Sequence, residues 1–255
     1  MLKVRVIPVL LLKNNRMVKP VRFGAGGERD VGWPTTTARI YNSQDADELI
    51  FLDIDATTQS KEFLTETLSD IARDCFIPIT AGGGIRSIQT IQSILSSGAD
   101  KVSINSYALE RPAFITEAAD TFGRQCIVVS IDIRKTKSGG YEVFAERGTK
   151  ATGRDAIDWA REAASLGAGE LLITSIDNEG MQNGYDLELT RLAADAVNVP
   201  VIANGGAGTR QHFVDGVLLG HASAVAGSSI FHFTDSNLTQ VKSFMYNAGL
   251  SIRPI

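Results

Sequence analysis

Four aspartates stand at the ends of apolar runs, where a carboxyl group could act as a general acid or base. They are Asp53, Asp55, Asp132 and Asp177. The carboxyl ends of the strands of a parallel barrel meet at one mouth, so four acids at this level favour a site. A single strand-end aspartate is about as well explained as a cap for the loop that follows it. Asp132 is the strongest catalytic candidate, because the apolar run Ile127–Ile131 before it would raise its pKa.

Two glycine-rich turns follow apolar runs and precede helical segments, at Gly82-Gly83-Gly84 and at Gly205-Gly206. Unhindered backbone amides at the start of a helix can bind an anion. Such glycines can also serve only to allow a tight turn, but the two patterns together favour phosphate sites on opposite sides of one mouth. The expected phosphate-binding residues are Gly83, Gly84, Asn105 and Ser106 at the first site, and Gly205, Gly206, Ser228 and Ser229 at the second. The run Leu171–Gly180 adds Asp177 and Gly180 to the second side.

Four charged residues occupy the opposite ends of the apolar runs. Arg5, Glu48, Lys101 and Glu170 stand at the starts of four expected strands. Charges at these positions are costly in a closed barrel unless they pair with one another. We therefore expect a ring of two cations and two anions across the bottom of the barrel, which on these residues alone serves stability.

Composition limits the class of protein. The chain has 255 residues, of which 44% are hydrophobic and 21% charged, which suits a single α/β domain over residues 1–255. A net charge of −4 gives no basic footprint for nucleic acid, and no apolar run is long enough to span a membrane. Cys75, Cys126 and three dispersed histidines offer neither a disulfide framework nor a metal cluster. Because the first residues do not form a convincing signal peptide, we expect a cytoplasmic protein with no metal or cofactor.

Apolar runs of strand length alternate with amphipathic segments of helix length, which is the pattern of a parallel sheet with crossover helices. About eight strands are expected, the number that closes a (β/α)8 TIM barrel. Similar short sequences occur in the first and second halves of the chain, which suggests an internal half-barrel repeat. The expected strands are Val4–Leu12, Leu49–Asp53, Pro78–Ala81, Lys101–Ile104, Ile127–Asp132, Leu171–Thr174, Pro200–Ala203 and Ala222–Ala226.

Other segments carry local signals. Ser87 and Asp155 are expected to cap helices, and Glu62–Cys75 is expected to be helical. Lys19–Thr37 is expected to be a long loop, plausibly a lid over the substrate, with Lys19 a solvated charge unless the loop closes over a phosphate. A small hairpin is expected over Asp132–Arg147. His232, on an apolar segment, is expected to be structural.

Several phrases together resemble one family. They are Phe51-Leu-Asp-Ile54, Gly82-Gly-Gly-Ile85, Ala99-Asp-Lys-Val-Ser-Ile-Asn105, Leu172-Ile-Thr-Ser-Ile-Asp177, Asn183-Gly-Tyr-Asp186, Gly205-Gly-Ala-Gly208 and Ile230-Phe-His-Phe233. Over essentially its whole length the chain resembles the HisF family, the cyclase subunit of imidazole glycerol phosphate synthase. The resemblance implies a (β/α)8 barrel, two phosphate sites, and a HisH-like glutaminase that docks on the barrel bottom as a heterodimer partner and passes ammonia through the barrel. It also implies that Arg5, Glu48, Lys101 and Glu170 form the gate for that ammonia.

The chain departs from this family at a catalytic position. It reads Ile7-Pro-Val-Leu-Leu11, so that Leu11 stands where the family has a catalytic aspartate, while the second catalytic aspartate is matched by Asp132. An aliphatic side chain cannot transfer a proton, so the loss should cost orders of magnitude in rate. Glu179 in place of aspartate and Asp55 in place of threonine are further departures.

The phrases Val9-Leu-Leu-Leu-Lys-Asn14 and Asp53-Ile-Asp-Ala56 look more like the WbuZ branch of the family. That branch is associated with glycosyl amidation, which makes acetamidino sugars for surface polysaccharides such as O-antigen. The leading expectation is a HisF-like subunit that uses ammonia to amidate a phosphorylated or nucleotide-linked sugar. One alternative is the cyclase of histidine biosynthesis, which converts PRFAR and ammonia to imidazole glycerol phosphate and AICAR. A second alternative is a non-catalytic subunit that docks a glutaminase and channels ammonia.

Overall fold

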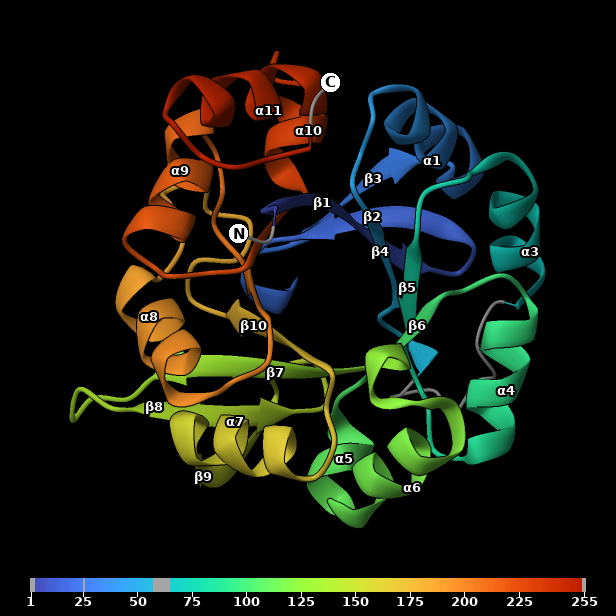
Figure 1. Cartoon of the computed structure of the whole chain (residues 1–255), viewed down its shortest axis with the longest axis vertical. Helices are drawn as coiled ribbons and strands as arrows, with labels where there is room; N and C mark the ends of the chain where they lie inside the picture. Colours follow the sequence, from blue (N-terminus) through green and yellow to red (C-terminus); the bar gives the residue numbers. More distant parts are fainter. Residues whose placement is uncertain (1–2, 25, 57–64, 254–255) are drawn as a thin grey trace.

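The computed structural model describes residues 3–24, 26–56 and 65–253, and eight parallel strands close into a ring within these ranges. The order around the ring is β10, β11, β12, β1, β4, β5, β6 and β7, and β7 pairs with β10 to close it. Figure 1 shows helices surrounding these strands. The fold is the predicted α/β TIM barrel. The barrel strands are β1 (Arg5–Lys13), β4 (Leu49–Asp53), β5 (Ile79–Gly82), β6 (Lys101–Ile104), β7 (Ile127–Lys135), β10 (Glu170–Ser175), β11 (Val201–Asn204) and β12 (Ala224–Gly227).

The helices return the chain from the end of one strand to the start of the next. Two predicted caps are confirmed: Ser87 accepts from the Thr90 amide at the start of α4, and Asp155 accepts from the Ile157 and Asp158 amides at the start of α7. The helices are α1 (Pro34–Ser43), α3 (Thr65–Asp74), α4 (Ile88–Ser96), α5 (Ser106–Glu110), α6 (Ala113–Phe122), α7 (Ala156–Ser165), α8 (Leu187–Ala196), α9 (Arg210–Leu218), α10 (Ser229–Phe233) and α11 (Leu238–Asn247), with 3-10 turns η1 (Arg22–Gly24) and η2 (Arg124–Cys126).

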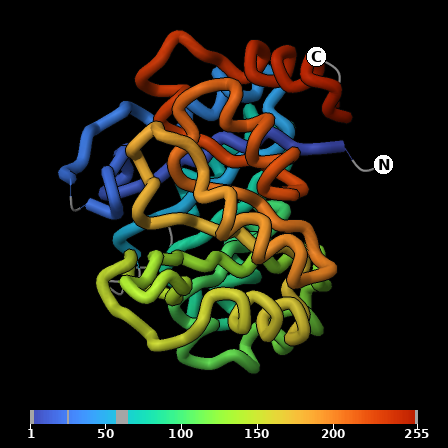
Figure 2. Tube along the Cα trace, turned by 90° about the vertical axis from the view of Figure 1, so that its left-hand side faces the viewer, coloured from blue at the N-terminus to red at the C-terminus, as the bar shows by residue number. Residues whose placement is uncertain are grey.

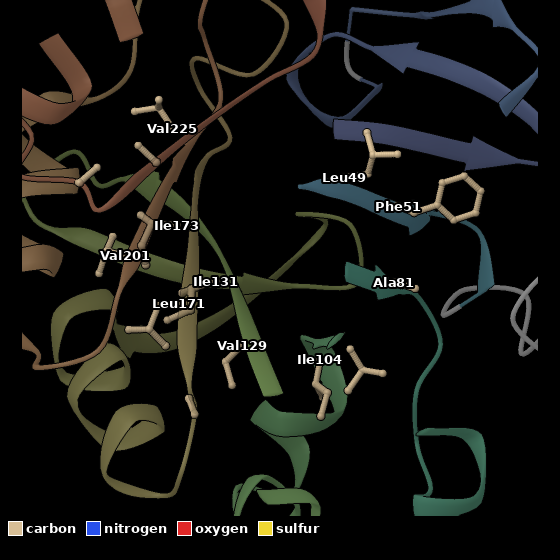
Figure 3. Close-up of a cluster of buried hydrophobic side chains, with 14 of the residues drawn as sticks. Leu49, Phe51, Ala81, Ile104, Val129, Ile131, Leu171, Ile173, Val201 and Val225 are labelled. Carbon is tan, nitrogen blue, oxygen red and sulfur yellow. The ribbon is translucent and has the colours of Figure 1, made fainter. Parts of the chain in front are cut away.

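Alternation along the strands divides the apolar side chains into two cores. The larger lies between strands and helices and includes the side chains labelled in Figure 3, such as Phe51 and Ile173. The smaller fills the barrel interior and consists of Ile7, Val9, Ile50, Val128, Leu172, Ile202, Ala224 and Ala226. Because adjacent strands are in parallel register, with Val9 beside Ile50 and Leu172 beside Ile202, the interior residues form layers across the barrel.

The two ends of the barrel differ. The bottom of the barrel is the end at which its strands start. Both described chain ends lie there, with Val4 bridging Ile252, on the right in Figure 2. The hairpins after β1 and β7 lie at the opposite end. At the bottom, the fully buried Lys242 of α11 donates to Asp47 Oδ1 at 2.9 Å. Asp47 also accepts from the Val6 amide, so this ion pair fastens the last helix to the first strand.

The prediction of a long loop over Lys19–Thr37 is wrong. A hairpin of β2 (Arg16–Pro20) and β3 (Glu28–Gly32) lies there, and α1 already begins at Pro34. Asn14 and Asn15 form the turn before β2 with φ of 49° and 60°, a conformation that asparagine tolerates well. This asparagine pair and the proline in the first turn of α1 were the sequence signals for both elements.

The predicted hairpin after Asp132 is present. Strand β7 pairs in antiparallel fashion with β8 (Tyr141–Ala145). A third strand that sequence reasoning missed, β9 (Lys150–Asp155), extends it. In the predicted helix Glu62–Cys75, residues 62–64 lie outside the described residues, and α3 covers Thr65–Asp74.

Candidate functional site

A pocket of about 1080 Å³, counted to its open mouth, lies at the carboxyl ends of the barrel strands. Ligand pockets of TIM barrels occupy this end. The structure brings six of the predicted site residues into its lining: Gly83, Gly84, Asn105, Ser106, Asp132 and Ser228.

Asp132 is a buried acid of this pocket. Its side chain points inward from β7, and its Oδ2 accepts from Asn105 Nδ2 at 2.7 Å. Burial raises the pKa of Asp132 from 3.8 to about 7, with a smaller contribution from the negative charge of Glu179, while the Asn105 hydrogen bond opposes the rise. A carboxyl group with this pKa is populated in both protonation states near neutral pH, so it can donate or accept a proton.

Leu11 lines the same pocket and places an aliphatic side chain at the end of β1. It pairs in register with Leu52, another pocket residue. Asp53, the acid that follows Leu52, accepts from the Asp55 and Ala56 amides through Oδ1 at 3.0 and 3.1 Å. Asp53 therefore stabilises the loop after β4, the capping role that rivalled catalysis in the sequence interpretation.

Lys19 is not a solvated loop charge, so that prediction is wrong. Its ammonium is buried in the pocket wall and forms an ion pair with the buried Glu179. The Glu179 carbonyl also accepts from the Arg22 amide at 2.8 Å, which fastens the chain after β2 to the loop after β10. Lys19 and Glu179 are 160 positions apart, and no local pattern joins them.

The first expected phosphate site requires its glycines. Gly83 has a φ of 126°, and a Cβ there would lie 2.2 Å from the Asp53 carbonyl oxygen. Gly84 has a φ of 66°, also in the left-handed region. Beside them, Asn105 Oδ1 is buried and has no hydrogen-bond partner among the described residues. Ser106 Oγ accepts from the Glu146 amide at 3.1 Å and so holds the β8–β9 turn next to this site.

The second expected site is tightly packed. A Cβ on Gly206 would lie 2.1 Å from the Gly184 carbonyl oxygen, and one on Gly180 would lie 2.9 Å from that of Pro20. Asp177 contacts the end of β7: its side chain is half exposed, lies 3.7 Å from Arg134 and accepts from the Lys135 amide. As formed by the described residues, the pocket lining omits five expected members of this site: Asp177, Gly180, Gly205, Gly206 and Ser229.

The four charged residues at the strand starts form a closed ring. Arg5 contacts Glu48 at 2.6 Å and Glu170 at 3.0 Å, and Lys101 contacts the same two carboxylates at 3.0 and 3.1 Å. Thr80 donates a further hydrogen bond to Glu48 Oε1 at 2.5 Å. Each cation is thus shared between both anions, and the ring is neutral overall.

Between this ring and the pocket lies the apolar interior of the barrel, followed by a polar level. There Ser103 Oγ lies 2.7 Å from Ser130 Oγ, and Asn204 Nδ2 donates to Thr174 Oγ1 at 3.1 Å. All four residues line the pocket. The barrel axis therefore runs from a charged ring, through small and aliphatic side chains, to hydroxyls and amides at the pocket floor.

Other groups bear less directly on the site. His232 of α10 packs against the ring of Tyr41, and burial lowers its pKa to about 4, so its imidazole is neutral near pH 7 and fits a structural role. Cys75 is buried and Cys126 half-buried, both as free thiols.

Over residues 3–24, 26–56 and 65–253, no group of three or more His, Cys, Asp or Glu could hold a metal ion. The helices in the same ranges are all too short or too polar to cross a membrane.

Comparison with protein families places the chain in a known family. The model of the family described as "Histidine biosynthesis protein" matches residues 5–236. The matched region begins at the first strand and includes all eight barrel strands, the charged ring and every pocket-lining residue.

Proposed function

The chain belongs to the histidine biosynthesis protein family, and from that premise we propose that it is a HisF-type, ammonia-using synthase subunit diverged towards amidation of a sugar. The proposal rests mainly on one observation: Asp132 and Leu11 line the same pocket. The resemblance to the cyclase implies two acid/base groups, and here one of the two positions is aliphatic. A missing acid/base group costs about 10²- to 10⁴-fold in rate. This is compatible with a different reaction at the same site.

The ammonia reaches the pocket from the barrel bottom. A neutral ring of ion pairs closes that end, and the interior above it contains the small side chains of Ala224 and Ala226. Ammonia is small and uncharged, so it can cross an apolar layer that excludes ions. The hydroxyls of Ser103 and Ser130 then offer hydrogen-bond partners at the pocket floor.

A HisH-like glutaminase supplies this ammonia by docking over the ring, as the family resemblance implies. Exposed apolar side chains at this end support the assignment. Phe76, in the turn before β5, is 87% exposed, and Leu219, in the turn before β12, is 56% exposed. Both turns lie at the strand starts, on the same end as the ring. Exposed aromatic residues are typical anchors of protein interfaces.

Asp132 acts on the substrate. The glycine turn at Gly83-Gly84 receives a phosphoryl group of a phosphorylated or nucleotide-linked sugar. Protonated Asp132 donates to the oxygen of the N-acetyl carbonyl as the ammonia nitrogen adds to its carbon, and the carboxylate then takes a proton from that nitrogen. Asp132 returns the proton to the hydroxyl, which leaves as water while the C=N bond of the amidine forms and the nitrogen gives up its second extra proton. The pKa of about 7 keeps enough of the acid form for this step near neutral pH.

The runner-up is the cyclase reaction on PRFAR, which the retained Asp132 and the glycine turns favour. A growth test separates the two. In a histidine auxotroph that lacks HisF, the sugar-amidation proposal predicts no growth when this chain is expressed in soluble form. Restored growth would overturn that proposal in favour of the cyclase.

Purified protein gives the direct test. The chain is incubated with ammonium salts and either PRFAR or a nucleotide-linked N-acetyl sugar, and substrate loss is followed by mass spectrometry. We expect slow or absent loss of PRFAR, together with an ammonia-dependent change of the sugar that Asp132→Asn abolishes. Turnover of neither substrate, with stimulation of a partner glutaminase, would contradict the proposal and favour a docking subunit.

A further inference from the structure

We propose that Arg147 is a specificity-determining residue of this pocket, which binds a phosphoryl oxygen of the substrate beside Gly83-Gly84. It rests on the proposed function only in assuming a substrate with a phosphoryl group. The expected phosphate-binding residues are all uncharged at the first site, whereas Arg147 lines the same pocket and carries a guanidinium.

Two contacts place Arg147 next to the glycine turn. The Glu146 amide donates to Ser106 Oγ, which fixes the β8–β9 turn beside the first site. Arg147 Nη1 donates to Asp55 Oδ1 at 2.7 Å. The residue after Asp55 is Ala56, and its Cβ lies 2.9 Å from where a Cβ on Gly84 would be. Arg147 thus lies between the loop after β4 and the loop after β6, at the glycine turn itself.

The turn that presents Arg147 holds an unfavourable conformation. Glu146 and Arg147 have φ of 51° and 60°, and neither is glycine. A non-glycine residue in this left-handed region costs about 1 kcal/mol or more. Thr149 Oγ1 stabilises the turn by donating to the Glu146 carbonyl at 2.6 Å. Backbone strain of this kind is often found at functional positions, and here one of the two strained residues is Arg147, which lines the pocket.

The ion pairs of Arg147 orient its guanidinium without using all of its donors. Asp55 is buried and holds one side, while Glu28 of β3 accepts from Nη2 at 3.0 Å and is shared with Lys13 at 2.6 Å. A guanidinium has five N–H donors, and the described residues account for these two bonds. The remaining donors suit the planar recognition of phosphoryl oxygens.

The two other cations of the pocket lining are less suited to this role. Lys19 is committed to its buried ion pair with Glu179. Arg86 likewise donates from both terminal nitrogens, to Glu110 at 2.9 and 3.0 Å, but its side chain is half exposed and this carboxylate partner is itself exposed. Arg147 differs from Arg86 in being less exposed, at 24% against 50%, and in being held from two sides, by Asp55 and Glu28.

The test is a titration of the isotope-labelled chain with inorganic phosphate, followed by the NMR shifts of individual glycine amides. In the unmodified protein, we expect the Gly83 and Gly84 amides to shift with phosphate. In Arg147→Gln, the phosphate concentration that gives half of the maximal shift at these amides should rise about tenfold or more, as expected for the loss of a charge-assisted hydrogen bond. Gly205 and Gly206 report on the second site and should keep the response of the unmodified protein.

Arg161→Gln is the matched control, because Arg161 forms an exposed ion pair with Asp158 on α7, and it should change nothing. Equal phosphate binding at Gly83 and Gly84 in Arg147→Gln and the unmodified protein would overturn the proposal, and so would no phosphate response at these amides in the unmodified protein. If Arg147→Gln does not fold, Arg147→Lys takes its place: it keeps the charge but loses the planar fork, so binding at Gly83 and Gly84 alone should weaken several-fold. Neither ammonia nor PRFAR enters this titration, so its outcome is independent of the turnover assays.

Discussion

Replacing Asp132 with asparagine removes a carboxyl group whose ionisation opposes folding. The folded pKa of about 7 exceeds the ordinary value of 3.8, so the folded state holds this proton over a range in which the unfolded chain has released it. Stability is therefore fully present below about pH 4 and falls as the pH rises to about 7. A difference of about 3 pKa units at 1.36 kcal/mol each gives a loss of at most about 4 kcal/mol. Asparagine has no such titration.

The assay is urea unfolding of the natural chain and Asp132→Asn at several values between pH 4 and pH 8. We expect the difference in free energy of unfolding to shift in favour of Asp132→Asn as the pH rises, by up to about 4 kcal/mol. Asp158→Asn, at a highly exposed carboxylate of α7, is the control and should show no comparable shift. The same difference between Asp132→Asn and the natural chain at pH 4 and pH 8 would show that burial does not disfavour the ionised form of Asp132.

Three further predictions concern packing and docking. Gly83→Ala should destabilise the fold by several kcal/mol in urea unfolding, because its Cβ would collide with the Asp53 carbonyl, whereas Gly139→Ala, with positive φ but open space, should cost about 1 kcal/mol; equal costs would contradict this. Lys242→Ala leaves the buried Asp47 without its ion-pair partner and should lower the free energy of unfolding by about 3–5 kcal/mol in the same assay. Lys150→Ala, at an exposed ion pair, should lower it by less than about 1 kcal/mol. A small loss of stability in Lys242→Ala would show that other groups compensate the charge of Asp47. Phe76→Asp should weaken glutaminase binding about tenfold or more in calorimetry without lowering stability, while Trp33→Asp, an exposed aromatic at the other end, should not; equal effects would place the partner elsewhere.

The sequence predicted the barrel because a strand that is buried on both faces is visible in the sequence as a continuous run of apolar residues. Each of the eight predicted strands overlaps an observed one, and the caps at Ser87 and Asp155 were equally local. The β2–β3 hairpin escaped prediction because β3 is largely exposed and is tied to β2 by ion pairs such as Arg16 with Asp30. The buried positions of β2 include the charged Lys19, so neither strand forms an apolar run.

The site was predictable only in part. Asp132 and Gly83 could be placed because strand ends and glycine turns have local signatures. The ion pair of Lys19 with Glu179 joins positions 160 apart, and that of Arg147 with Asp55 joins positions 92 apart. Such contacts depend on how loops from different strands meet over the pocket. Asp177 shows the converse, since it follows a strand end and yet is half exposed and does not line the pocket as the described residues form it.

We propose that Leu11 distinguishes this chain from the cyclase, while Asp132 in the same pocket is kept. The most direct test of this proposal is PRFAR turnover with ammonium salts, comparing the natural chain with Leu11→Asp. We expect little turnover by the natural chain and a gain of about 10²-fold or more on restoring the acid at position 11. Rapid PRFAR turnover by the natural chain, unchanged or lowered by Leu11→Asp, would contradict it.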